Sequence, residues 1–125
     1  LFARHDGRTI LRAAAADVGL LASHREGCPN AVLESLAAGR PVVATDVGAV
    51  PDLVRDGVDG RVVPVRDVDA LAEALRNVLG REWPAEALAT APAVKSWEQV
   101  AEEVHDVLAR AVGLQVPEGK GATTA

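Results

Sequence analysis

The sequence is poor in aromatic residues and in sulfur. Of its 125 residues only 2% are aromatic, none is methionine or tyrosine, and Cys28 is the only cysteine. A lone cysteine excludes an internal disulfide and fits a reducing compartment, so we expect a cytoplasmic location. With so few large rings, the core of a folded domain must be filled mainly by small apolar side chains such as alanine and valine.

Basic residues are outnumbered by acidic ones: the sequence has 13 Lys and Arg residues and 18 Asp and Glu residues, which gives a net charge of −5. Nucleic-acid-binding domains need a basic surface, so we expect no nucleic-acid partner. No apolar run approaches the roughly 18 residues of a transmembrane helix, and no signal peptide is recognisable at the start. Peripheral association of a longer protein with a membrane stays open.

The beginning of the sequence suggests a fragment. It lacks an initiating methionine, and residues 1–3 are typical of the end of an apolar strand. We expect residues 1–112 to form one domain. Residues 113–125, with their glycines and threonines, are expected to form a disordered tail.

Short apolar segments alternate along the chain with segments of helical spacing. Strands are predicted at 18–21, 42–45 and 61–65, and helices at 8–16, 29–38, 50–55, 67–79, 85–91 and between Ser96 and Gly113. This alternation predicts an α/β domain with a Rossmann-like parallel sheet flanked by helices. Ligands of such sheets bind beyond the carboxyl ends of the strands, which places 23–30 and 46–50 at the expected binding edge.

Two glutamates, Glu26 and Glu34, are separated by seven residues across a predicted loop and helix start. A helix that begins near Pro29 offers free N–H groups and the positive end of its dipole, which together suit a phosphate. These amides are expected at Asn30, Ala31 and Val32, and Gly27 lets a ligand approach the backbone closely. The sequence therefore predicts an anion site between the two carboxylates.

The two carboxylates suit the hydroxyls of sugars. Glu34 shares a helix face with Ala31 and Ala38, whose small side chains leave room for two hydroxyl donors of a ribose. Glu26 would accept hydroxyls from a second sugar, so that the whole site fits a nucleotide sugar. The alternative is that Glu26 is a solvated loop residue and Glu34 an ordinary helix-surface residue favoured by the dipole.

Several motifs in this part of the chain occur together in a known family. They are Glu26-Gly27-Cys28-Pro29-Asn30-Ala31-Val32-Leu33-Glu34, Asp46-Val47-Gly48 and Asp56-Gly57-Val58-Asp59-Gly60. In this order and spacing they resemble the donor-binding C-terminal half of family 4 glycosyltransferases of GT-B fold. Two glutamates with seven intervening residues are the signature of that family.

The resemblance implies a role for each residue of the motif. Glu26 would contact the donor hexose and help stabilise positive charge at its anomeric carbon, while Glu34 would bind the ribose hydroxyls. The loop beside the sugar and diphosphate would be formed by Gly27, Cys28, Pro29 and Asn30, and the amides of Ala31 and Val32 would bind phosphate. The family transfers a hexosyl group with retention and generally needs no metal ion, so we expect no cofactor.

Further parts of such an enzyme would lie upstream of this chain. The resemblance implies a missing N-terminal domain that binds the acceptor, and an Arg and a Lys before residue 1 that neutralise the diphosphate. Cys28 stands where an aromatic residue is common, which leaves the identity of the donor open. Cys28 at a helix start is compatible with a nucleophile, but without a histidine partner a small structural residue is favoured.

Other interpretations remain open from the sequence. Residues 46–48 are either a phosphate- or base-facing turn or a plain tight turn. The three histidines lack metal-ligand spacing. The whole protein is either a transferase, a GT-B relative such as an epimerase or phosphorylase, or a non-catalytic binding module.

Overall fold

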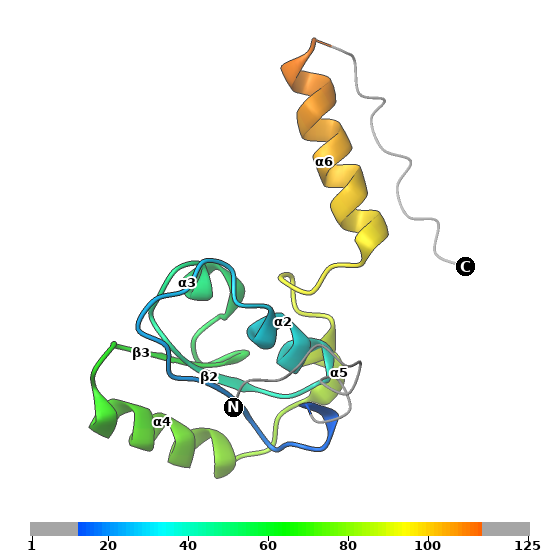
Figure 1. Ribbon diagram of the computed structural model, residues 1–125. Coiled ribbons are helices and arrows are strands. Elements are labelled where there is room, and N and C mark those ends of the chain that lie inside the picture. The colour runs from blue at the N-terminus through cyan, green and yellow to red at the C-terminus, as the bar shows by residue number, and fades with distance from the viewer. Residues whose placement is uncertain (1–12, 114–125) are drawn as a thin grey trace. The chain divides into compact units, whose positions relative to one another are not determined.

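The computed structural model describes residues 13–113, which fall into two units divided between Val94 and Lys95 (Figure 1). The predicted strand at 1–3 and, apart from Gly113, the predicted tail at 113–125 lie outside the described residues. Of the predicted helix at 8–16, residues 13–16 are described, and only Ala13 and Ala14 among them are helical.

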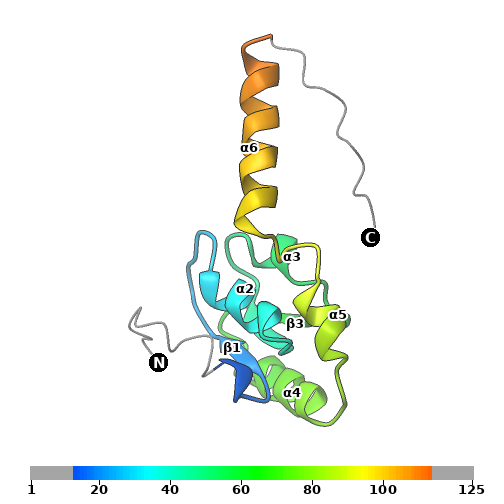
Figure 2. The same ribbon diagram turned by 90° about the vertical axis from the view of Figure 1, so that its right-hand side faces the viewer.

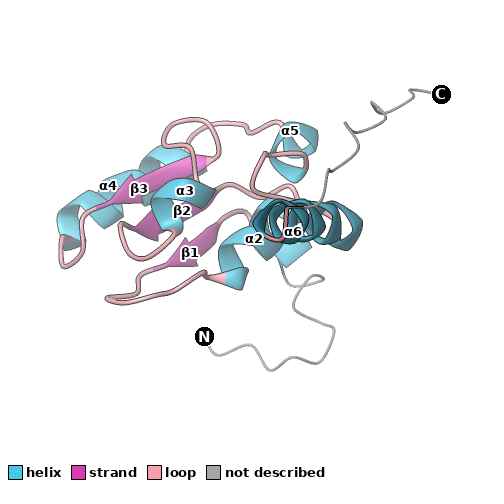
Figure 3. Cartoon of the chain, turned by 90° about the horizontal axis from the view of Figure 1, so that it is seen from above, coloured by secondary structure: helices cyan, strands magenta, loops and turns pink. Residues whose placement is uncertain are grey.

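Within residues 13–94, the first unit is built on a parallel sheet of three strands in the order β1-β2-β3. The strands are β1 (Gly19–Leu21), β2 (Val42–Thr45) and β3 (Gly60–Val63), and the helices are α2 (Asn30–Ala37), α3 (Val50–Leu53), α4 (Val68–Leu79) and α5 (Ala85–Ala89). In register, Gly19 pairs with Val42, and Val42 pairs with Gly60. Figure 3 shows the three strands side by side. The predicted Rossmann-like α/β fold class is confirmed.

Helices cover both faces of this sheet, with α4 on one face and α2 on the other (Figures 1 and 2). All four residues of the central strand β2 are buried, and their side chains alternate between the two faces. Val42 and Ala44 pack in one apolar cluster with α2, α3 and α5, whereas Val43 packs in a second cluster with α4. The core is thus filled almost wholly by valine, leucine and alanine, as the composition predicts.

Local backbone chemistry explains where the helices begin and end. Gly39 follows α2 with φ +71°, and the amides of Gly39 and Arg40 donate to the carbonyls of Leu36 and Ser35 in a Schellman motif. The carboxylate of Asp67 caps α4 by accepting the amide of Ala70 at 2.8 Å. The predicted strand at 61–65 ends at Val63 because Pro64, the next residue, has no N–H for the ladder.

The turn between α3 and β3 is held by a buried carboxylate. Asp59, which is 1% exposed, accepts the backbone amide of Arg55 at 3.0 Å and two guanidinium bonds from the same residue at 2.7 and 2.6 Å. Burial alone would raise the pKa of Asp59, but the hydrogen bonds and charge of Arg55 outweigh it and hold this pKa below its ordinary value. The paired carboxylate fixes the entry of the chain into β3.

The second unit contains helix α6 (Trp97–Ala111). Its start has the predicted capping box, in which the Ser96 hydroxyl accepts the Gln99 amide and the Gln99 side chain accepts the Ser96 amide. Lys95 Nζ lies 2.7 Å from the Glu103 carboxylate. None of the described helices is long and apolar enough to cross a membrane.

Candidate functional site

The predicted site residues gather at the carboxyl ends of the strands. Residues 22–29 follow β1 and lead into α2, and residues 46–49 follow β2 and lead into α3. Because β1 and β2 are parallel and paired in register, their carboxyl ends meet at the same edge of the sheet. The first of these two loops carries Glu26, and Glu34 lies in the second turn of α2.

The two loops are in direct backbone contact. The amide of Ala49 donates to the carbonyl of Gly27 at 2.9 Å. Gly48 has φ +52°, and a Cβ on this residue would lie 2.3 Å from the carbonyl oxygen of Glu26 and 2.5 Å from that of Gly27. Only glycine allows this approach, so the turn at 46–49 supports the peptide that carries Glu26. A ligand-facing role of this turn stays a prediction.

The side chain of Glu26 is half-buried and held within its own loop. Its Oε1 accepts a hydrogen bond from the Ser23 hydroxyl at 2.6 Å. The carbonyl of Ser23 in turn accepts the hydroxyl of Thr45, the last residue of β2, at 2.5 Å. These hydroxyls connect the carboxylate to the sheet.

The start of α2 leaves backbone donors exposed. Pro29 is buried and takes the N-cap position with φ −78° and ψ 104°, without a side-chain cap. Among the described residues, no acceptor is found for the amides of Asn30 and Ala31, and both residues are exposed. The positive end of the helix dipole adds to the attraction that these two amides exert on an anion.

The backbone amide of Val32 is not free, although the sequence analysis expects a free N–H there. Its N–H donates to the carbonyl of Pro29 at 3.1 Å, and its side chain is 1% exposed in the core. The tight first turn of the helix, with its i to i−3 bond, explains this engagement. The phosphate-binding role of Val32 stays a prediction, with Asn30 and Ala31 as its better placed neighbours.

The remaining predicted residues are open to solvent or partly so. Glu34 is half-buried on α2, and no hydrogen-bond donor is found for its carboxylate within residues 13–113. Cys28 is exposed as a free thiol. A Cβ on Gly27 would meet nothing within 4 Å, so packing does not require glycine there, and the space beside it is free for a ligand.

A small cavity of about 140 Å³ adjoins the Glu26 loop at this edge of the sheet. It is lined by residues at the carboxyl ends of all three strands and by the first turn of α4, among them Ser23, His24, Thr45 and Arg66. Arg66 is the one non-glycine residue with positive φ, 62°, in the described part of the chain. Ser23 lies in the segment 23–30 that the sequence places at this edge, whereas Thr45 and Arg66 were not singled out from the sequence, although both lie at the carboxyl ends of strands.

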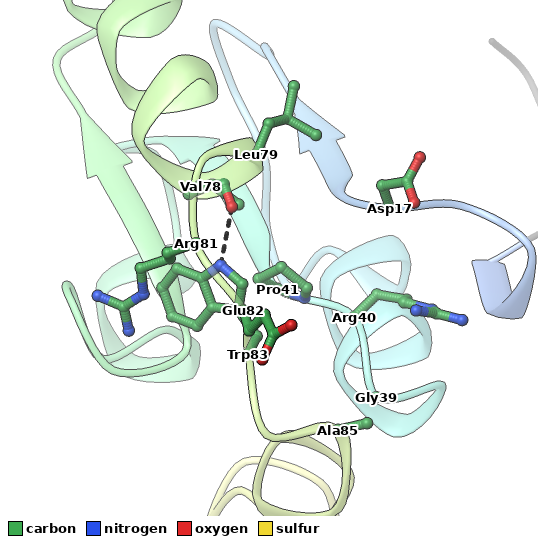
Figure 4. A pocket seen from close by; sticks show the side chains of 10 residues that line it. All are labelled: Asp17, Gly39, Arg40, Pro41, Val78, Leu79, Arg81, Glu82, Trp83 and Ala85. Atoms are coloured by element: carbon green, nitrogen blue, oxygen red, sulfur yellow. Dashed lines mark hydrogen bonds between the residues drawn. The ribbon is translucent and has the colours of Figure 1, made fainter.

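A larger cavity of about 570 Å³ lies at the opposite edge of the sheet (Figure 4). Its lining includes Arg40, Pro41 and Trp83, and the indole N–H of Trp83 donates to the carbonyl of Val78 at 2.9 Å. Arg81 stacks on the same indole ring at 3.6 Å from the centroid. None of the predicted site residues lines this cavity, so size alone does not identify the functional site.

No group of three or more His, Cys, Asp or Glu side chains that could hold a metal ion is found between residues 13 and 113. His24 lies exposed in the loop, and His105 lies on α6 beside Asp106. This edge of the sheet presents carboxylates, hydroxyls and helix-end amides, together with the side chains of His24 and Arg66.

Comparison with known proteins identifies the family. Residues 9–81, more than half of the chain, match the family model described as glycosyl transferases group 1. The chain belongs to this family. The matched segment includes Glu26, Glu34 and the turn at 46–49, so the resemblance on which these residues were singled out is confirmed.

Relatives and a solved structure agree with this assignment of a glycosyltransferase domain. The chain is 48% identical over 67 residues to a D-inositol 3-phosphate glycosyltransferase of Geodermatophilus obscurus, covering 54% of the chain and 15% of the relative. It is 35% identical over 112 residues to the protein of the same name from Mycobacterium avium, covering 86% of the chain and 26% of the relative. Sucrose-phosphate synthase from Thermosynechococcus elongatus superposes with a TM-score of 0.70 and 27% identity, over 82% of this chain and 27% of that one.

The glycosyltransferase domain thus spans about a quarter or less of the length of these relatives. The names of the relatives describe those whole proteins. The superposition on a protein of GT-B architecture confirms the predicted fold beyond the local motifs.

Proposed function

We propose that this domain binds the donor of a glycosyltransferase that moves a hexosyl group from a nucleoside diphosphate sugar to an acceptor with retention. The observation that carries the proposal is the position of Glu26 and Glu34. They flank the exposed amides at the start of α2, at the carboxyl edge of the sheet and within the segment that matches the family.

Each part of the donor has a matching group in the site. The amides of Asn30 and Ala31 face solvent at the positive end of α2 and would bind the diphosphate. Glu34, one turn along the helix, would accept the two ribose hydroxyls. Glu26, before the helix, would accept hydroxyls of the hexose and stabilise the positive charge that develops at its anomeric carbon.

Catalysis in this proposal depends on position and electrostatics. Helix-end amides stabilise the departing nucleoside diphosphate, and we propose that transfer needs no metal ion or other cofactor. The acceptor would be held by a further domain of the same protein, as the greater length of the relatives suggests. A reducing cytoplasmic compartment, suited to the single Cys28, belongs to the same proposal.

Nucleotide binding by the 125-residue chain tests the donor site. UDP and GDP are titrated into the chain by calorimetry and by amide chemical shifts, and we expect millimolar binding with shifts centred on Asn30 and Ala31. Glu34→Gln is expected to weaken the binding of at least one nucleotide by about three- to tenfold. The ribose hydroxyls would then donate to a neutral amide oxygen in place of a charged carboxylate.

Glu73→Gln is the matched control, because Glu73 is an exposed glutamate on α4, a helix that carries none of the predicted site residues. It is expected to bind both nucleotides like the wild type. The proposal is wrong if neither nucleotide causes heat or shift changes, or if Glu34→Gln and Glu73→Gln behave alike.

A further inference from the structure

Three residues form a continuous chain of hydrogen bonds that ends on Glu26. Thr45 donates its hydroxyl to the carbonyl of Ser23 at 2.5 Å, and Ser23 donates its hydroxyl to Oε1 of Glu26 at 2.6 Å. Thr45 belongs to β2, the central strand, and is 5% exposed. These hydrogen bonds therefore begin at the buried central strand and end on an irregular loop.

The Thr45 hydroxyl has two carbonyl groups within reach as hydrogen-bond acceptors. The carbonyl of Leu21, in the paired strand β1, lies 3.4 Å from it, which is too long for a strong bond. The short bond is the one to Ser23, two residues beyond β1. This bond ties the backbone of Ser23, in the loop after β1, to β2.

The backbone and the side chain of Glu26 are fixed by separate contacts. Its carbonyl abuts Gly48, and the neighbouring carbonyl of Gly27 accepts the Ala49 amide. Those contacts set the position of the peptide but leave the rotatable bonds of the glutamate side chain free. Within the described residues, the Ser23 hydroxyl is the group that restrains the carboxylate itself.

We propose that Ser23 is a positioning residue for Glu26, and that Thr45 positions Ser23. The Ser23 hydroxyl holds Oε1, so that Oε2 is presented in one orientation to the hydroxyls of the donor hexose. This inference rests on the proposed function of Glu26. It adds that the hexose contact is set by β2 through two hydroxyls that themselves do not touch the donor.

Restraint of the Glu26 side chain by Ser23 affects the binding affinity for the hexose and not for the nucleotide. A glutamate side chain that is already immobilised loses less conformational freedom when it binds a ligand. In this proposal the hexose contacts Glu26 and the nucleoside diphosphate does not. Loss of the Ser23 hydroxyl therefore reduces the contribution of the hexose to binding affinity and leaves that of the nucleoside diphosphate unchanged. A merely structural role of Ser23 would instead change both contributions alike.

The test uses the 125-residue chain and two measurements. Three-bond couplings from NMR report whether the Glu26 side chain keeps one rotamer without ligand. Dissociation constants for UDP and UDP-glucose, and for GDP and GDP-mannose, report the gain in affinity that the hexose provides. The variants are Ser23→Ala, Ser23→Thr, Thr45→Val and Thr45→Ser. Thr90→Val is the control, because Thr90 also donates its hydroxyl to a carbonyl but is the C-cap residue that follows α5.

We expect Ser23→Ala to average the Glu26 couplings and to lower the gain from the hexose by about three- to tenfold, with nucleotide affinity unchanged. Ser23→Thr and Thr45→Ser keep the hydroxyls and should restore both readouts. Thr45→Val should act in the same direction as Ser23→Ala but more weakly, and Thr90→Val should change neither readout.

The inference is overturned if Glu26 keeps one rotamer in Ser23→Ala, or if the gain from the hexose is unchanged. Equal weakening of nucleotide and nucleotide sugar would also overturn it, since that pattern indicates a general structural defect. A wild-type chain that bound none of the four ligands would refute the proposed function instead, while the couplings would still decide whether Ser23 orients Glu26.

Discussion

Gly48 lies directly against the carbonyl of Glu26, so that the two loops at the carboxyl edge of the sheet touch there as well as at the bond between Ala49 and Gly27. We predict that Gly48→Ala destabilises the chain by about 2–4 kcal/mol, from left-handed strain together with overlap against a backbone oxygen. Urea unfolding followed by circular dichroism measures the change.

Gly57→Ala separates the two causes of this loss. Gly57 also has positive φ, +78°, but a Cβ there would meet nothing within 4 Å. It should therefore show the strain alone, about 1 kcal/mol. Equal losses in the two variants would mean that the contact between Gly48 and Glu26 contributes nothing.

Asp59 gives a second prediction, because its carboxylate is buried and its partner Arg55 is half-exposed. Asp59→Asn keeps the shape but removes the charge, and we expect a loss of about 2–3 kcal/mol in the free energy of unfolding. The control is Asp56→Asn, which removes an exposed pair with Arg61 and should cost less than about 1 kcal/mol.

The contribution of Asp59 is also predicted to depend on pH. Since folding lowers its pKa below the ordinary value of 3.8, its stabilisation is complete above that value and disappears as the pH falls through the lower pKa of the folded state. The difference in unfolding free energy between wild type and Asp59→Asn should therefore stay constant at neutral pH and shrink as the pH falls below 3.8. A difference that stayed constant, or grew in acid, would contradict the ion pair.

Arg66 gives a third prediction, because an arginine with φ 62° occupies a backbone conformation that suits glycine. Arg66→Gly is expected to raise the free energy of unfolding by about 0.5–1 kcal/mol. Arg66→Ala removes the same guanidinium but retains the strain, and thermal unfolding should place it within about 0.5 kcal/mol of wild type. If alanine stabilised as much as glycine, the side chain and not the backbone would be responsible.

Local patterns in the sequence predicted most of the fold. The bounds of β2, the Asp67 cap of α4 and the capping box at Ser96 depend on neighbouring residues alone, and all three were found as expected. The same patterns placed Glu26 on a loop and Glu34 on a helix that follow the carboxyl end of β1, as the structure shows.

Contacts between distant residues were beyond such patterns. The bond from Thr45 to Ser23 joins residues that are 22 positions apart, and it exists only because β1 and β2 pair in one particular register. The approach of Gly48 to Glu26 depends on the same pairing. The engaged amide of Val32 follows from the tightness of one helical turn, which composition does not specify.

The bond between Ala49 and Gly27 bears on how this domain can be re-engineered. Residues 23–29 and 46–49 are far apart in the gene but were fitted to one another as a single backbone unit. A chimera that imports one loop from a relative would pair it with a foreign neighbour, whereas a chimera that imports both would preserve their fit. Under the donor role proposed for these loops, a change of sugar preference should therefore require both loops to be exchanged, and sequence libraries should vary the two segments together.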